Sequence, residues 1–175
     1  MRRTIVLLTV LAGVPPVVAE TAGGIQWTMP AAWKSEGARP MRAATYRAPA
    51  APGDKEDGEC AVFYFGPGQG GGVEDNVKRW IEQFEQPDGK PSQQAAQIRK
   101  QTVNRLSVTT IDLAGTYSGS AGPMSPSKVS KPGYRLLGAI VEAPQGAVFF
   151  KFTAPAKTLA KNEEAFQSLL KSLRR

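Results

Sequence analysis

Histidine is absent from the 175-residue sequence, and cysteine occurs once. Without histidine the chain cannot form the Ser-His or Cys-His arrangements of many hydrolases, nor a histidine metal site. The single thiol, Cys60, excludes an intrachain disulfide, so stability has to come from packing. Because Cys60 lies in an apolar run that ends at Phe65, we expect a buried small residue rather than a reactive thiol.

Long apolar runs are also scarce, and the main one covers residues 5–14. It follows two arginines and precedes a small-residue site that ends at Ala19, which is the pattern of a cleavable signal peptide. The run is too short for the ~20 residues that span a bilayer. We therefore expect residues 1–19 to be a signal peptide and residues 20–175 to form one periplasmic or secreted domain without a membrane span.

Basic residues exceed acidic ones, but they form no run of five. Without residues 1–19, the chain keeps 20 basic and 15 acidic residues, a net charge of +5. This excess favours an anionic partner, either an unknown envelope protein or an anionic surface. Scattered charge and the expected export both argue against nucleic acid as the partner.

Apolar periodicity predicts an α/β sandwich. The amphipathic spacing of residues 73–84 and 155–173 predicts two helices. The predicted strands are residues 25–29, 42–48, 59–65, 101–104, 107–117, 134–143 and 147–154. The third strand is apolar on both faces, so the sheet should be covered on both sides. We expect an antiparallel central sheet of about six or seven strands between the two helices.

Two end motifs accompany this order of elements. Residues 27–33 (Trp-Thr-Met-Pro-Ala-Ala-Trp) open the domain, and residues 166–173 (Phe-Gln-Ser-Leu-Leu-Lys-Ser-Leu) close it. Together they resemble the Mog1/PsbP-like superfamily, in particular its exported bacterial members. The resemblance implies a central antiparallel sheet between helical layers, and a binding or accessory role rather than catalysis. It assigns no site residue, because nothing here matches a functional motif of the superfamily.

A glycine-rich segment, residues 66–71, fits the pattern G-x-G-x-x-G between a strand and a helix, where backbone amides can bind phosphate. Pro67 removes one of those amides, and no βαβ order follows, which disfavours a dinucleotide site. Two interpretations stay open: a tight turn, or contact of Gly68, Gly70 and Gly71 with some anion.

Arginines alternate with aromatic residues near one end of the predicted sheet. Arg39, Arg42 and Arg47, with Trp33 and Tyr46, could bind an anion through bidentate hydrogen bonds and stacking. Ordinary surface charge above buried aromatic rings is the alternative.

Acidic residues gather just before the third predicted strand. Asp54, Glu56, Asp57 and Glu59 could ligate calcium, but they lack the twelve-residue loop of an EF-hand and enclose a lysine. A solvated loop is the alternative, and we assign no metal and no cofactor.

Residues 118–133 are rich in glycine, serine and proline, which predicts a long surface loop. Met124, Lys128 and Lys131 would there contact an anionic partner that has some apolar surface. An unconstrained tether is the alternative.

A Ser-Lys pair or a carboxylate pair is possible in principle, but no Ser-x-x-Lys motif stands at the start of a predicted helix, and Asp112 and Glu142 are isolated in predicted strands. We therefore predict a non-enzymatic binding or accessory module of the cell envelope that contacts its partner through loops. The alternative is a small-ligand carrier or weak hydrolase with a pocket between sheet and helix. An apolar pocket with converging polar groups would favour this alternative.

Overall fold

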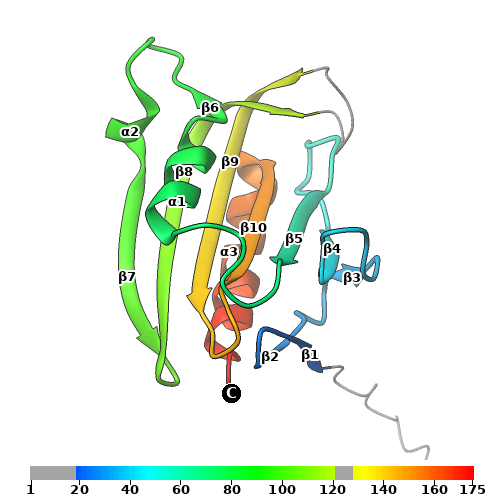
Figure 1. The fold of residues 1–175 in the computed structure, drawn as a ribbon. Coiled ribbons are helices and arrows are strands. Elements are labelled where there is room, and N and C mark those ends of the chain that lie inside the picture. The colour runs from blue at the N-terminus through cyan, green and yellow to red at the C-terminus, as the bar shows by residue number, and fades with distance from the viewer. Residues whose placement is uncertain (1–18, 121–127) are drawn as a thin grey trace, which may run out of the picture.

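The computed structural model, which describes residues 19–120 and 128–175, contains an antiparallel sheet with a helix on each face (Figure 1). The strands are β1 Ala19–Ala22, β2 Ile25–Thr28, β3 Lys34–Ser35, β4 Ala44–Ala48, β5 Gly58–Tyr64, β6 Phe84–Glu85, β7 Gln97–Val103, β8 Leu106–Ser120, β9 Lys128–Glu142 and β10 Val148–Pro155. Eight of them form the main sheet in the order β3-β4-β5-β10-β9-β8-β6, with β7 also paired to β8. The other two, β1 and β2, form a separate hairpin.

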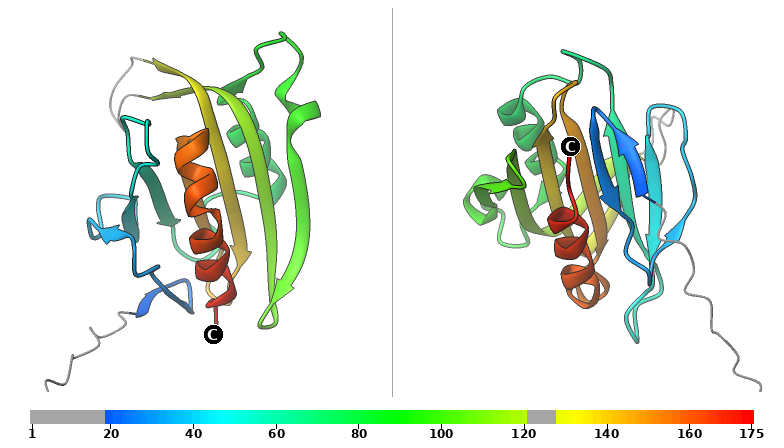
Figure 2. Two further views of the ribbon diagram at one scale, coloured as in Figure 1. Left: turned by 180° about the vertical axis from the view of Figure 1, so that it is seen from behind. Right: turned by 90° about the horizontal axis from the view of Figure 1, so that it is seen from below.

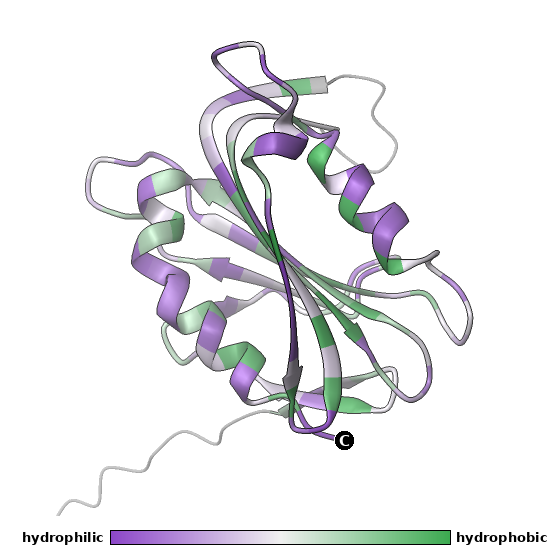
Figure 3. Ribbon diagram, turned by 90° about the vertical axis from the view of Figure 1, so that its left-hand side faces the viewer, coloured by the Kyte–Doolittle hydropathy of each residue, from purple (hydrophilic) through white to green (hydrophobic). Residues whose placement is uncertain are grey.

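Two helices cover opposite faces of the sheet, α1 (Val73–Ile81) and α3 (Ala156–Lys171), as the views in Figure 2 show. A third, α2 (Ser92–Ala95), is a single turn before β7. Figure 3 shows hydrophilic and hydrophobic residues on both long helices, as expected where one side of a helix is buried. The predicted sandwich is confirmed, with eight strands in the sheet. Within the described ranges, no helix has the length and hydropathy needed to cross a bilayer.

Alternation along the strands divides the core between the two faces, which we call the α1 side and the α3 side. In β10, Phe150 and Phe152 belong to the core on the α3 side, while Phe149 belongs to the core on the α1 side. Lys151 has the same parity as Phe149 and therefore also faces the α1 side. The strand β5 carries apolar residues on both faces, as predicted, but Glu59 and Phe63 on its α1 side are only half-buried, so the predicted cover of both faces is wrong for this strand.

On the α3 side, aromatic rings from several strands pack against α3. The ring of Trp27 meets Phe150 edge-on, with centroids 5.2 Å apart, and the rings of Phe152 and Phe166 lie 5.8 Å apart. All four side chains are at most 1% exposed. Cys60 is also buried on this side, which confirms the prediction of a small core residue, and burial raises the pKa of its thiol.

Buried polar groups on the α3 side have partners. The indole N–H of Trp27 donates to Tyr46 Oη at 2.7 Å, and the Tyr46 hydroxyl donates in turn to the Glu20 carboxylate. The indole N–H of Trp33 donates to Asn162 Oδ1 at 3.0 Å. Since each of these groups is satisfied, this layer joins β1, β2, β4 and α3 into a closed core.

The core on the α1 side is smaller and lies off-centre. It consists of residues from α1, β6, β8 and β9 with Phe149 of β10. Gly138 in β9 makes room for the helix, because a Cβ there would lie 2.4 Å from Cζ3 of Trp80. Helix α1 thus covers the β8–β9 half of this face, and in Figure 1 no helix lies in front of β4 and β5.

The predicted loop at residues 118–133 is wrong in its bounds. β8 and β9 form a hairpin that continues to Ser120 and restarts at Lys128, with Tyr117 paired to Lys131. A register shift between Gly115 and Tyr117 accommodates Pro132, which cannot donate to the ladder. Strand pairing therefore overrides a composition that is typical of loops, and Met124 lies outside the described residues.

Candidate binding face

The uncovered half of the α1 side presents polar side chains from β4, β5 and β10, and we call it the open face. The strand register places Arg47 opposite Glu59, and Lys151 opposite Ala61. Arg42, from the turn before β4, lies over the ring of Phe63, with its guanidinium carbon 5.5 Å from the ring centroid. The open face therefore combines cations with an aromatic floor.

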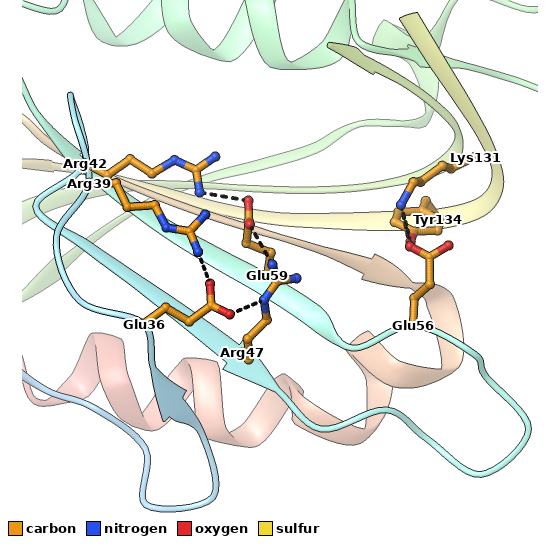
Figure 4. A network of polar contacts seen from close by, with 8 residues as sticks. All are labelled: Glu36, Arg39, Arg42, Arg47, Glu56, Glu59, Lys131 and Tyr134. Atoms are coloured by element: carbon orange, nitrogen blue, oxygen red, sulfur yellow. Dashed lines mark hydrogen bonds and ion pairs between the residues drawn. The ribbon is translucent and has the colours of Figure 1, made fainter. Parts of the chain in front are cut away.

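Three arginines that the sequence analysis singled out lie together on this face, and two glutamates bind them (Figure 4). Glu36 accepts from Arg39 at 2.5 Å and from Arg47 Nε at 2.8 Å. Glu59 lies 3.0 Å from Arg42 and 3.6 Å from Arg47. The hydrogen bond from Arg47 holds the pKa of Glu36 below its usual value. These arginines are therefore already paired within the chain, and their contact with an external anion stays a prediction.

A second polar group, shown apart from the arginines in Figure 4, connects β9 to the loop before β5. Lys131 forms an ion pair with Glu56, and the hydroxyl of Tyr134 donates to the same carboxylate at 2.8 Å. The bond from Lys131 is the main cause that lowers the pKa of Glu56. Lys131, predicted as a loop contact without acidic neighbours, is thus a strand residue with an acidic partner. Lys128 begins β9, and its part in partner contact stays a prediction.

Lys151 lies where the open face meets α1; the residue as a whole is half-buried, and its ammonium group is the more buried part. It donates to the side-chain oxygen of Gln83, and its Nζ lies 3.3 Å from Tyr117 Oη. No carboxylate of the described residues lies within ion-pair distance of it. Burial is the main cause that lowers the pKa of Lys151 to about 8; the charge of Arg42 adds to this effect, and the charge of Glu59 opposes it.

A cavity of about 180 Å³ lies between α1 and the sheet beside this lysine, and we call it the Lys151 cavity. Its lining includes four aromatic rings, two amides and two cations, and none of the described acids belongs to it. The lining residues are Phe63, Phe65, Trp80, Phe149, Asn76, Gln83, Arg79 and Lys151. A pocket between sheet and helix, which the alternative function requires, is therefore present.

Sequence comparison connects this chain to no family: no family model matches it, and no curated protein matches it either. Structure comparison does find a match. The solution structure of cyanobacterial PsbP (CyanoP) from Synechocystis sp. PCC 6803 superposes over 93% of this chain and 94% of that chain, with a TM-score of 0.50 and 12% sequence identity. The chain has a PsbP-like fold. The predicted resemblance is confirmed at this level, and an identity this low shows the fold alone.

In this PsbP-like sandwich, the glycine loop between β5 and α1 lies against the Lys151 cavity. Gly68, Gly70 and Gly71 all have positive φ, which favours glycine. A Cβ at Gly70 would lie 2.9 Å from the rings of Phe65 and Phe149, both of which line the cavity. The loop is therefore a tight turn that packs on the cavity wall, and its contact with an anion stays a prediction.

The acidic cluster does not converge on one point. Asp54 accepts hydrogen bonds from Thr158 N at 2.9 Å and Oγ1 at 2.7 Å, at the start of α3. Asp57 accepts from the backbone N–H of Ala50 at 2.9 Å, while Glu56 and Glu59 bind the cations described above. Among the residues that the structure describes, no group of three or more Cys, Asp or Glu is placed to hold a metal ion.

Sequence reasoning missed Lys151, the residue at the border between the open face and α1. Lys151 interrupts the aromatic run of β10, Val-Phe-Phe-Lys-Phe, and a lone charge inside such a strand is the signal that could have found it. Its neighbours Gln83 and Arg79 had no comparable signal, because both lie on the polar side of the predicted helix. Only the packing of α1 on β9 and β10 brings them to Lys151.

Proposed function

We propose that this chain is an exported, non-enzymatic binding module of the cell envelope, and that its open face contacts an acidic segment of a partner protein. The observation that carries the proposal is the incomplete cover of the sheet. Among the residues that the structure describes, no helix covers one half of the α1 side, and the side chains there are charged and aromatic rather than aliphatic. A face of this composition is typical of a surface that binds a polar partner.

Charge supports an acidic partner. The open face and its rim present seven cations, Lys34, Arg39, Arg42, Arg47, Arg79, Lys131 and Lys151, against four acids, Glu36, Glu56, Asp57 and Glu59. The internal ion pairs at the rim are partly exposed, and such pairs contribute only ~0–1 kcal/mol to stability. Carboxylates of a partner can therefore replace the internal acids at little cost.

Catalysis is disfavoured by the contacts of Lys151. Its ammonium bonds to a neutral amide and lies near a phenol, and neither is a general base at neutral pH. A small-ligand carrier is the second candidate function, and the Lys151 cavity is the observation that favours it. Its volume lies below the ~300–1,000 Å³ of typical ligand pockets, so the cavity suits one small group rather than a whole cofactor.

The test is charge reversal on the open face, followed by capture of partners from envelope extract. Arg39→Glu combined with Arg79→Glu should reduce recovery of the partner at least tenfold, because both side chains are exposed and the partner's carboxylates would be repelled. The control, Lys100→Glu combined with Lys157→Glu, makes the same change in net charge at exposed positions on β7 and α3. Equal recovery by both double variants would contradict the proposal.

A further inference from the structure

Positive charge surrounds the Lys151 cavity, and no acid of the described residues lines it. Lys151 and Arg79 line it, and Arg42 covers the outer side of Phe63, one of its walls. Within the described part of the chain, two buried side-chain polar atoms lack a hydrogen-bond partner, and Arg42 Nη1 is one of them. It lies 3.0 Å from Glu59 but without the angle of a hydrogen bond. Arg42 is paired with Glu59, whereas the two cations in the lining, Lys151 and Arg79, have no acid beside them in that lining, which favours an anion as ligand.

The rest of the wall selects for a flat apolar group. Phe63, Phe65, Trp80 and Phe149 surround the cavity, and the rings of Phe65 and Phe149 lie 5.9 Å apart at an angle of 58°. The volume of about 180 Å³ is close to that of a cavity of ~150 Å³ that holds benzene. One six-membered ring or a short side chain fills such a space, and the rest of a larger ligand has to extend out of the open side of the cavity.

The donors are held in place before any ligand arrives. Asn76 donates from Nδ2 to the carbonyls of Gly70 and Gly72, at 2.8 Å each, while its Oδ1 accepts from Arg79 at 3.1 Å. Lys151 is fixed by Gln83, two residues past the end of α1. Pre-ordered donors lower the entropy cost of binding, so even a small ligand gains affinity.

We propose that the Lys151 cavity binds a carboxylate carried on a flat apolar group, such as an aromatic acid. The carboxylate lies between Lys151 and Arg79, and the ring lies among Phe63, Phe65 and Trp80. This inference rests on the proposed function, because the cavity lies beside the same open face. It names the chemical class of ligand that this part of the protein binds. The carboxylate belongs either to a free small acid or to the end of a protein chain.

The test is an NMR titration of the protein with sodium benzoate. We expect saturable shifts of the Trp80 indole N–H and of the Asn76 side-chain amide. The indoles of Trp27 and Trp33 lie in the core on the α3 side and should not move. Benzamide, which keeps the ring, and acetate, which keeps the charge, should each bind at least tenfold more weakly. Equal affinity for benzamide and benzoate would overturn the proposal.

Variants separate the cavity from general charge effects. Lys151→Met should weaken benzoate binding at least tenfold. Arg79→Gln, at an exposed position that does not threaten folding, should weaken it severalfold. Lys78→Gln, at the neighbouring exposed position outside the cavity, serves as the control and should bind as the unmodified protein does. If both Lys151→Met and Arg79→Gln retain full affinity, the proposal fails.

A second ligand identifies the source of the carboxylate. An acetylated dipeptide that ends in phenylalanine should be compared with its C-terminal amide. Tighter binding of the free-acid peptide than of benzoate indicates a chain end of a protein, and the reverse order indicates a small acid. If the protein binds neither benzoate nor the free-acid peptide, the inference is overturned. Partner capture is a separate measurement, and its failure would contradict only the proposed function.

Discussion

The two faces of the sheet are built differently, although they share the same strands. On the α3 side, a sixteen-residue helix covers a core in which Trp27, Tyr46 and Trp33 have their hydrogen bonds satisfied. On the α1 side, a nine-residue helix covers half of the sheet, and the other half carries Lys151 without an acidic partner. The α3 side is therefore built for stability, and the α1 side retains polar groups that contribute little to it.

This difference teaches where to look for function in a small sandwich. Burying a cation without an acidic partner costs free energy of folding. Such an arrangement therefore points to a functional site. The unsatisfied buried polar atoms among the described residues, Arg42 Nη1 and Thr45 Oγ1, both lie on the α1 side. The unequal distribution of satisfied and unsatisfied groups, rather than any sequence motif, locates the candidate site.

Truncating one large aromatic side chain on each face should give the largest contrast. Phe166→Ala empties a site that is 1% exposed in the core on the α3 side, and we expect a loss of ~3–5 kcal/mol in the free energy of unfolding. Phe65→Ala, on the α1 side, removes a ring that is 39% exposed, so the loss should stay below ~1 kcal/mol. Urea denaturation of both variants measures the contrast, and similar losses would show that the two faces contribute equally.

The pH dependence of stability should reveal the buried cation on the α1 side. A lysine in the unfolded chain has a pKa of ~10.4, and burial lowers that of Lys151 to about 8. Between these values the unfolded state binds more protons, so the free energy of unfolding should rise with pH, by on the order of 3 kcal/mol across the window. The cost of the buried charge is fully present below pH 8.

Comparison with Lys151→Met isolates this effect. The variant lacks the titrating group, so its stability relative to the unmodified protein should fall as the pH rises from 7.5 to 10.5, measured by urea denaturation. Lys100→Met, at an exposed position on β7, is the control and should show a constant difference. Parallel pH profiles for Lys151→Met and the unmodified protein would show that the ammonium is not buried at a cost.

Apolar periodicity predicted β5, β10 and α3 well, because each buries a regular stripe of side chains against the core on the α3 side. It failed for residues 118–133, where cross-strand pairing stabilises a segment whose composition is typical of loops. The Lys151 cavity could not be predicted, since its residues come from β5, α1 and β10, and depend on register. Phe63 and Phe149 lie opposite each other only because β5 pairs with β10 in this register.

The most direct test of the central claim is site-specific photo-cross-linking on the two faces. A photoreactive p-benzoylphenylalanine replaces Phe65 beside the open face, or the exposed Glu164 on α3, and the protein is irradiated in envelope extract. We predict a cross-linked product from position 65, competed away by an excess of unmodified protein, and none from position 164. A product from position 164 alone, or equal products from both positions, would contradict the assignment of the α1 side as the binding face.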